Sequence, residues 1–144
     1  MTMKPAAKST CPCGTARSYA ECCGLFLSGQ ATAPNAEALM RSRYTAFTKR
    51  DEAYLLATWH PSTRPAALNL AGDAATKWIG LDVKNVEATG ADSASVEFVA
   101  RYKLGGRAQR LHEVSRFVRE QSRWFYVSAV ISTPAPSPPP ARTL

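Results

Sequence analysis

Apolar residues between positions 35 and 50 recur at helical spacing. Those that return every three or four positions are Ala36, Leu39, Met40, Tyr44 and Phe47. Such a stripe is typical of a helix with one face in the protein core. Asn35 stands directly before it, and asparagine at this position caps the free backbone N–H groups of a first helical turn. We therefore expect a helix that begins after Asn35.

A second helix is expected to begin at Asp51. The residues that it would carry inward are Tyr54, Leu55 and Trp59. A loop over residues 60–64 follows, because the prolines that bracket this segment interrupt helical hydrogen bonding. A short third helix is expected over Asp73–Ile79, with Gly80 at its end.

The second half of the chain alternates apolar and polar residues, which predicts strands. On one such strand, Val96, Phe98, Ala100 and Tyr102 share one face, and Glu97, Val99, Arg101 and Lys103 share the other. Further strands are expected over residues 81–88, 111–119 and 124–131, with turns at Gly105-Gly106 and at 120–123. Helices followed by an antiparallel meander predict an α+β fold, with the helices packed on one face of the sheet.

All four cysteines lie near the start of the chain, at Cys11, Cys13, Cys22 and Cys23. Four thiolates are the complete ligand set of a closed, tetrahedral structural zinc site, so we expect one structural Zn²⁺ with no open position for catalysis. Adjacent cysteines reach one ion only if their backbone is turned. Disulfide bonds and free thiols are weaker alternatives, and the ligand type alone does not exclude an iron–sulfur cluster. Lys8 and Arg17 are close enough in sequence to offset part of the negative charge of such a centre.

The composition fits one ordinary globular domain of 144 residues and excludes wholesale disorder. No apolar run approaches the roughly 18 residues of a membrane helix, and residues 1–10 contain no apolar signal segment. We therefore expect a soluble, cytoplasmic protein. The formal net charge is +7, which favours acidic or polyanionic partners. The basic residues are dispersed, which favours a solvated basic surface over a nucleic-acid footprint.

Six residues are candidates for a ligand pocket. They are Trp59, His60, Glu97, Arg101, His112 and Arg116. Each also has a purely structural interpretation: core packing for the tryptophan, a loop hydrogen bond for His60, and salt bridges on the sheet for the charged residues. The sequence contains no nucleophile elbow, phosphate loop or dinucleotide-binding fingerprint.

Several motifs resemble known families. Cys11-Pro-Cys13-Gly14, Ser18-Tyr19 and Cys22-Cys23-Gly24 resemble the SEC-C zinc-binding motif, although Ala16 stands where SEC-C motifs usually have glycine. The segments that begin at Ala36, Thr58, Trp78, Phe98 and Ser115 resemble the YchJ-like proteins, and the likeness covers about residues 10–130. It implies a nuclear transport factor 2-like (cystatin-like) domain, in which a curved antiparallel sheet wraps around helices as a cone. It also implies a pocket between the first two helices and the concave face of the sheet, with a basic group from Arg101 or Arg116.

These observations predict a zinc knuckle at residues 1–30, an α+β domain at 31–132 and a disordered proline-rich tail at 133–144. The function that we expect is a binding or adaptor module with a small-ligand pocket, whose partner is a protein or a small anionic ligand. One alternative is an enzyme of the lyase or isomerase type that uses the cone pocket. Another is a nucleic-acid- or ribosome-associated basic protein. A membrane partner is not expected.

Overall fold

A computed structural model describes residues 10–68, 70 and 76–131. Its elements are a 3-10 helix η2 (Tyr19–Glu21), the helices α1 (Cys23–Leu27), α2 (Ala36–Thr48) and α3 (Glu52–Ala57), and the strands β1 (Thr76–Gly90), β2 (Ser93–Leu104), β3 (Arg107–Glu120) and β4 (Arg123–Ile131). The strands form one antiparallel sheet in the order β1-β2-β3-β4. The predicted α+β class and the meander are therefore confirmed. The predicted tail at 133–144 lies outside the described residues.

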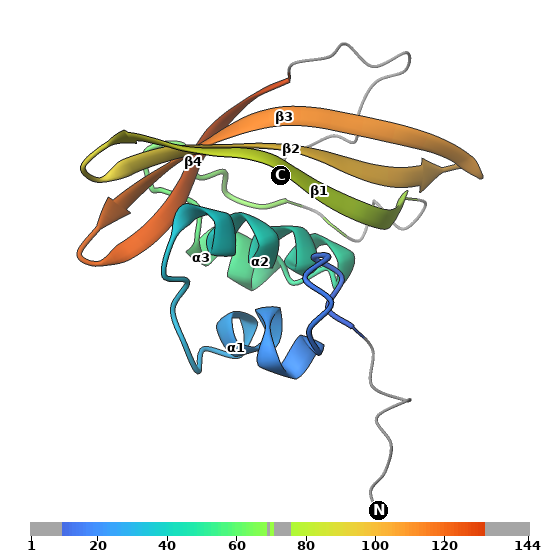
Figure 1. Cartoon of the computed structure of the whole chain (residues 1–144), viewed down its shortest axis with the longest axis horizontal. Coiled ribbons are helices and arrows are strands. Elements are labelled where there is room, and N and C mark those ends of the chain that lie inside the picture. Colours follow the sequence, from blue (N-terminus) through green and yellow to red (C-terminus); the bar gives the residue numbers. More distant parts are fainter. Residues whose placement is uncertain (1–9, 69, 71–75, 132–144) are drawn as a thin grey trace, which may run out of the picture.

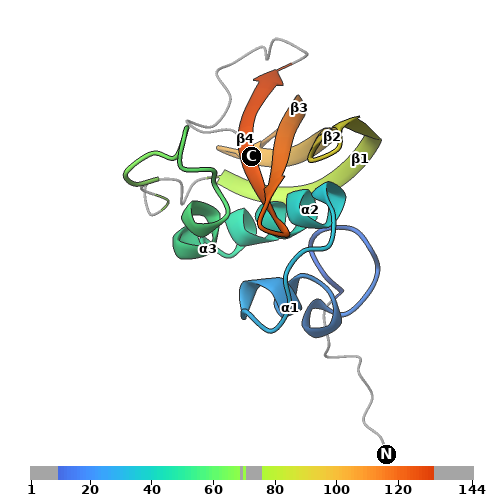
Figure 2. The same ribbon diagram turned by 90° about the vertical axis from the view of Figure 1, so that its left-hand side faces the viewer.

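Helix α2 lies between two layers (Figures 1 and 2). The sheet curves over one side of it, and the N-terminal segment with α1 covers the other side. This arrangement explains why α2 buries more than its apolar stripe. Ser42, Arg43 and Thr45 are as completely buried as Leu39 or Tyr44. The predicted apolar stripe is buried as expected, but the helix also buries polar residues outside this stripe.

The predicted cap at Asn35 and the predicted helix start at Asp51 are both confirmed. The Asn35 side chain accepts a 2.7 Å hydrogen bond from the backbone N–H of Ala38, and Asp51 accepts one of 3.1 Å from that of Tyr54. Helix α3 ends at Ala57, so Trp59 lies beyond it rather than within it. There the chain pairs with β4, because the backbone N–H of Tyr126 donates to the carbonyl of Thr58 at 2.8 Å.

The alternation on β2 correctly predicts the two faces of the sheet. Val96, Phe98, Ala100 and Tyr102 are fully buried against the helices, whereas Arg101 and Lys103 are exposed on the outer face. Val99 is an exception, since it is buried on the outer face between its cross-strand neighbours Asp82 and His112.

The helix predicted over Asp73–Ile79 is wrong for Thr76 to Ile79. Thr76 to Ile79 belong to β1, and residues 73–75 lie outside the described part of the chain. Trp78 pairs with Tyr102 on β2, and its ring packs against Tyr44 on α2 with centroids 5.9 Å apart. These long-range contacts override a local helical pattern. A bulge then leaves Ile79 between paired neighbours and 51% exposed.

A buried arginine occupies the space between α2, the end of α3 and the sheet. The Nη1 atom of Arg43 donates to the carbonyl of Leu55 and to the hydroxyl of Thr58, both at 2.8 Å. Its guanidinium carbon lies 4.4 Å from the ring centroid of Tyr126 and 5.1 Å from that of Trp59. Burial lowers the pKa of Arg43 to about 10, so the side chain stays charged at neutral pH. Trp59 is half-buried and packs against the core, in agreement with the structural interpretation of this residue.

Candidate metal centre

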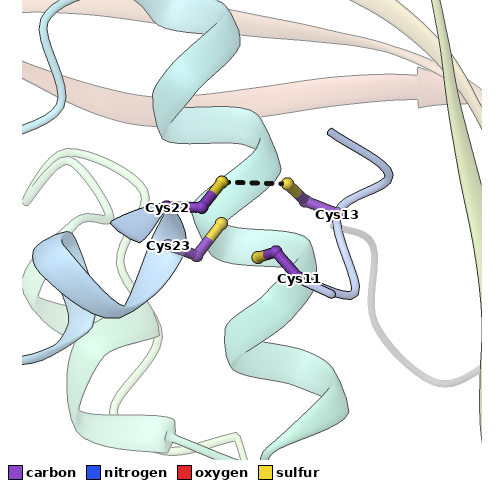
Figure 3. A group of neighbouring side chains, drawn as sticks. All are labelled: Cys11, Cys13, Cys22 and Cys23. Atoms are coloured by element: carbon purple, nitrogen blue, oxygen red, sulfur yellow. Dashed lines mark hydrogen bonds between the residues drawn. The ribbon is translucent and has the colours of Figure 1, made fainter. Parts of the chain in front are cut away.

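The four cysteine sulfurs converge on one point beside α2 (Figure 3). All four Sγ atoms lie within 4.8 Å of one another, the cysteines are all buried, and no disulfide joins them. In a tetrahedral zinc site with Zn–S bonds of about 2.3 Å, neighbouring sulfurs are about 3.8 Å apart. The Sγ atoms of Cys13 and Cys22 are 3.6 Å apart. The cluster therefore has the ligand type, number and dimensions of a site that could hold one metal ion.

Two turns of the backbone bring the sulfurs together. In the first, the N–H of Cys11 donates to the carbonyl of Arg17 at 2.7 Å, and Gly14 has a φ of 91°. In the second, Cys22 has φ −129° and ψ −114°, which is the turned backbone expected for adjacent ligands. Gly24 allows the close approach of Tyr19, since a Cβ at Gly24 would lie 2.7 Å from the Tyr19 carbonyl oxygen.

Ala16 has a φ of 69°, in the left-handed region that favours glycine. An alanine pays strain there that a glycine avoids, so Ala16→Gly is expected to raise the free energy of unfolding by about 0.5–1 kcal/mol. Urea unfolding of the metal-loaded protein measures this difference. The matched control is Ala20→Gly, which is equally exposed but lies in η2 with an ordinary φ and should be destabilising. A loss of stability in both variants would contradict the strain at Ala16.

The thiols influence one another's protonation. Hydrogen bonds from Cys13 and Cys23 lower the pKa of Cys11. The hydrogen bond to Cys11 raises the pKa of Cys23, and burial raises it further. The hydrogen bond to Cys11 also raises the pKa of Cys13. One sulfur of the cluster thus favours the thiolate while two neighbours keep their protons, and a divalent cation would displace these protons on binding.

Helix α2 supplies polar contacts to the cluster that the sequence analysis missed. The Nη1 of Arg41 donates to the carbonyl of Cys13 at 2.6 Å, and the Thr45 hydroxyl lies 3.7 Å from the sulfur of Cys11. The spacing of these two residues, one helical turn apart, was the available signal. Arg17, which was expected to offset the charge, donates instead to the carbonyl of Glu21 at 3.0 Å, and Lys8 lies outside the described residues.

The charged pocket candidates lie on the outer face of the sheet. Glu97 and His112 are paired at 2.7 Å, Arg101 is paired with Asp82, and Arg116 is exposed. The expectation that Arg101 or Arg116 reaches a pocket between helices and sheet is therefore wrong. Strand alternation puts Arg101 and Arg116 on the same face of the sheet, and this face is the outer one, opposite to the helices.

Trp59 and His60 lie beside β4, on the edge of this strand opposite to β3. The Nε1 of Trp59 donates to the hydroxyl of Thr63 at 3.0 Å. The imidazole of His60 lies 2.9 Å from the Glu120 carboxylate and 2.8 Å from the Ser62 hydroxyl. These contacts fix the loop after α3 against the end of β3. The six candidates therefore do not form one site.

A cavity of about 370 Å³ lies between α1, α3 and the turn that joins β3 to β4. Its apolar wall includes Phe26, Leu27, Leu39, Tyr54 and Trp124, and Asp51 and Arg123 also line it. Among the described residues, the buried Nε1 of Trp124 has no hydrogen-bond partner. This cavity was not predicted from the sequence, because its walls come from segments about 100 residues apart in the chain.

Residues 35–129 match the family described as the YchJ middle NTF2-like domain. A UPF0225 protein of Chromobacterium violaceum is 55% identical over 136 residues, which cover 92% of this chain and 100% of the relative. A UPF0225 protein of Xanthomonas campestris is 56% identical over 120 residues, which cover 83% of this chain and 92% of the relative. A SEC-C motif containing protein from Rhodopseudomonas palustris has a solution structure that matches with a TM-score of 0.79, at 32% identity, over 87% of this chain and 100% of its own. A crystal structure of a SEC-C motif containing protein from Psychrobacter arcticus matches with a TM-score of 0.73 at 28% identity, and the match covers 88% of this chain and 84% of that protein.

Proposed function

The chain belongs to the YchJ-like family, with a SEC-C motif before an NTF2-like domain, and we propose that it is a zinc-stabilised binding module. The observation that carries the proposal is the convergence of four buried cysteine sulfurs within 4.8 Å. Four thiolates fill the coordination sphere of zinc, so the ion would be structural rather than catalytic. When bound, it supplies a cross-link between the loop of Cys11 and Cys13 and the start of α1.

The binding part of the proposal rests on the cavity beside α1. Cys23 opens α1, and Phe26 and Leu27 follow on the same short helix to form one wall of the cavity. A metal at the cysteines would therefore hold this wall in place. Arg123, which lines the cavity, carries a guanidinium donor, and Phe26, Leu27 and Leu39 supply apolar surface. Such a site suits a small carboxylic acid with an apolar tail.

The enzyme alternative has one observation in its favour. Glu113 and Ser115 are fully buried on the inner face of the sheet, where a catalytic pair of a cone pocket would have to lie. However, the rings of Trp78 and Tyr102, which pack with centroids 5.3 Å apart, fill part of the same face. We therefore favour the binding module.

Metal analysis tests the first part of the proposal. Protein purified under reducing conditions should contain one equivalent of zinc, and denaturation without reductant should release four reactive thiols. Cys13→Ser should lose most of the metal, because it removes one of four ligands. Less than half an equivalent of metal, or two thiols missing to a disulfide, would overturn the zinc centre; iron in place of zinc would overturn the identity of the ion.

Thermal shift tests the second part. Medium-chain carboxylic acids are expected to raise the melting temperature of the metal-loaded protein, whereas the corresponding alcohols should not. Arg123→Gln should abolish the effect. Arg64→Gln removes a cation that does not line the cavity and serves as the matched control. Equal stabilisation by acids and alcohols, or by an inorganic salt, would contradict a carboxylate site.

A further inference from the structure

One end of the outer sheet face carries a cluster of basic side chains. Its members are Lys77 on β1, Arg101 and Lys103 on β2, and Arg110 on β3, all of them exposed. We call them the basic patch. It lies where β2 turns into β3, at the right of the sheet in Figure 1. These cations are dispersed along the sequence, and it is the hairpin between β2 and β3 that gathers them.

The register places like charges directly opposite each other. Lys77 pairs with Lys103, and Arg101 pairs with Arg110. Like charges at such positions repel and destabilise a sheet. Over the ranges that the structure describes, Arg101 has an ion-pair partner in Asp82, and the other three members of the patch have none. The local excess of positive charge is therefore not neutralised within this part of the chain.

The spacing of these cations suits a chain of regularly spaced anions. Neighbouring strands lie about 4.8 Å apart, and side chains two residues apart on one strand are separated by about 6.7 Å. The patch is thus a grid of flexible cations whose neighbours can each meet a separate anionic group. Phosphodiester backbones present such charges at short, regular intervals.

A protein partner fits this surface less well than a nucleic acid. Protein interfaces have a centre rich in aromatic and other apolar residues and poor in charge. Beside the patch, Ile79 is the large apolar side chain that the described structure leaves exposed. Direct contacts to phosphates need cations and no such apolar centre.

We propose that the basic patch binds the phosphodiester backbone of a nucleic acid without reading its sequence. This surface is separate from the cysteine cluster and from the cavity beside α1. The inference is therefore independent of the proposed zinc-stabilised binding function.

Fluorescence anisotropy with a short single-stranded RNA of mixed sequence, and in parallel with a short DNA duplex, tests the inference on the full metal-loaded chain. Between about 50 and 200 mM salt, the logarithm of the binding constant should fall with that of the salt concentration with a slope near −3 for the RNA, which corresponds to about four phosphate contacts at roughly 0.7 each. The variant Lys103→Gln/Arg110→Gln should reduce the slope by about 1.4 and weaken binding about tenfold at the lower salt concentration.

The matched control is Lys84→Gln/Arg116→Gln, which removes the same net charge from exposed positions outside the patch. It should change affinity less than threefold. Preferential binding of either probe supports the proposal and identifies the form of nucleic acid. Absence of binding at the lower salt concentration, equal weakening in both double variants, or equally effective competition by polyglutamate would overturn it, the last in favour of an acidic polypeptide.

Discussion

Removal of the proposed zinc ion is expected to lower the free energy of unfolding by about 4 kcal/mol, the contribution of a ligand present at roughly a thousand times its dissociation constant. The cysteines belong to the same buried cluster as Leu39, Met40 and Tyr44 of α2. If the cysteine segment separates from α2 after metal removal, one side of that helix becomes exposed. The sheet keeps its own inner-face contacts and should unfold cooperatively at a lower temperature. Calorimetry with and without a zinc chelator, and the same experiment on Cys13→Ser, measures the shift.

Hydrogen exchange separates a local from a global effect. Amides of η2 and α1 should exchange rapidly after chelation, whereas those of β2 and β3 should remain protected. Thr15→Ala is the matched control, since the Thr15 hydroxyl lies 3.1 Å from the Cys22 sulfur but supplies no thiolate. It should keep its metal and most of its stability. Uniform loss of protection in the strands would show that the N-terminal segment is indispensable to the whole domain.

Replacement of the buried arginine is the second change with a large expected effect. Arg43→Met should lower the free energy of unfolding by about 3 kcal/mol, because it leaves the Leu55 carbonyl without its charged donor and removes the stacking on Tyr126. Arg43→Lys keeps the charge but not the planar fork, and should recover only part of the loss. Urea unfolding at neutral pH measures both variants.

The matched control for Arg43 is Arg50→Met. Arg50 lies just beyond the same helix but is exposed, and this change should alter stability by less than about 0.5 kcal/mol. A neutral or stabilising effect of Arg43→Met would mean that apolar packing replaces the buried charge without loss, as happens for some buried ion pairs.

Local signals in the sequence were reliable where the relevant contacts are local. The cap at Asn35, the helix start at Asp51 and the alternation on β2 need only neighbouring residues, and all three are confirmed. The cysteine cluster was found because the residue types alone restrict their chemistry. The start of β1 could not be predicted in the same way, because the strand conformation of Trp78 depends on Tyr102 and Tyr44.

The remaining errors concern which faces of the sheet and of α2 are covered by other parts of the chain. Alternation puts Arg101 and Tyr102 on opposite faces of β2, so Arg101 could not also reach a pocket on the apolar face that the helices cover. Similarly, the helical stripe of α2 predicts one buried side and says nothing of a second layer over Arg41 and Thr45. Arg43 was missed because an arginine is exposed by default, and only the rings of Trp59 and Tyr126 provide a buried site for it.

The position of α2 between two layers restricts how the family can change in length. One inserted or deleted residue rotates the following part of a helix by about 100°. In most helices, such a rotation disturbs one contact surface while the solvent side absorbs the change. In α2 it would turn Tyr44 away from the sheet and Thr45 away from the Cys11 sulfur at the same time. Insertions and deletions among homologues should therefore fall in the connections on either side of α2 and spare the helix itself.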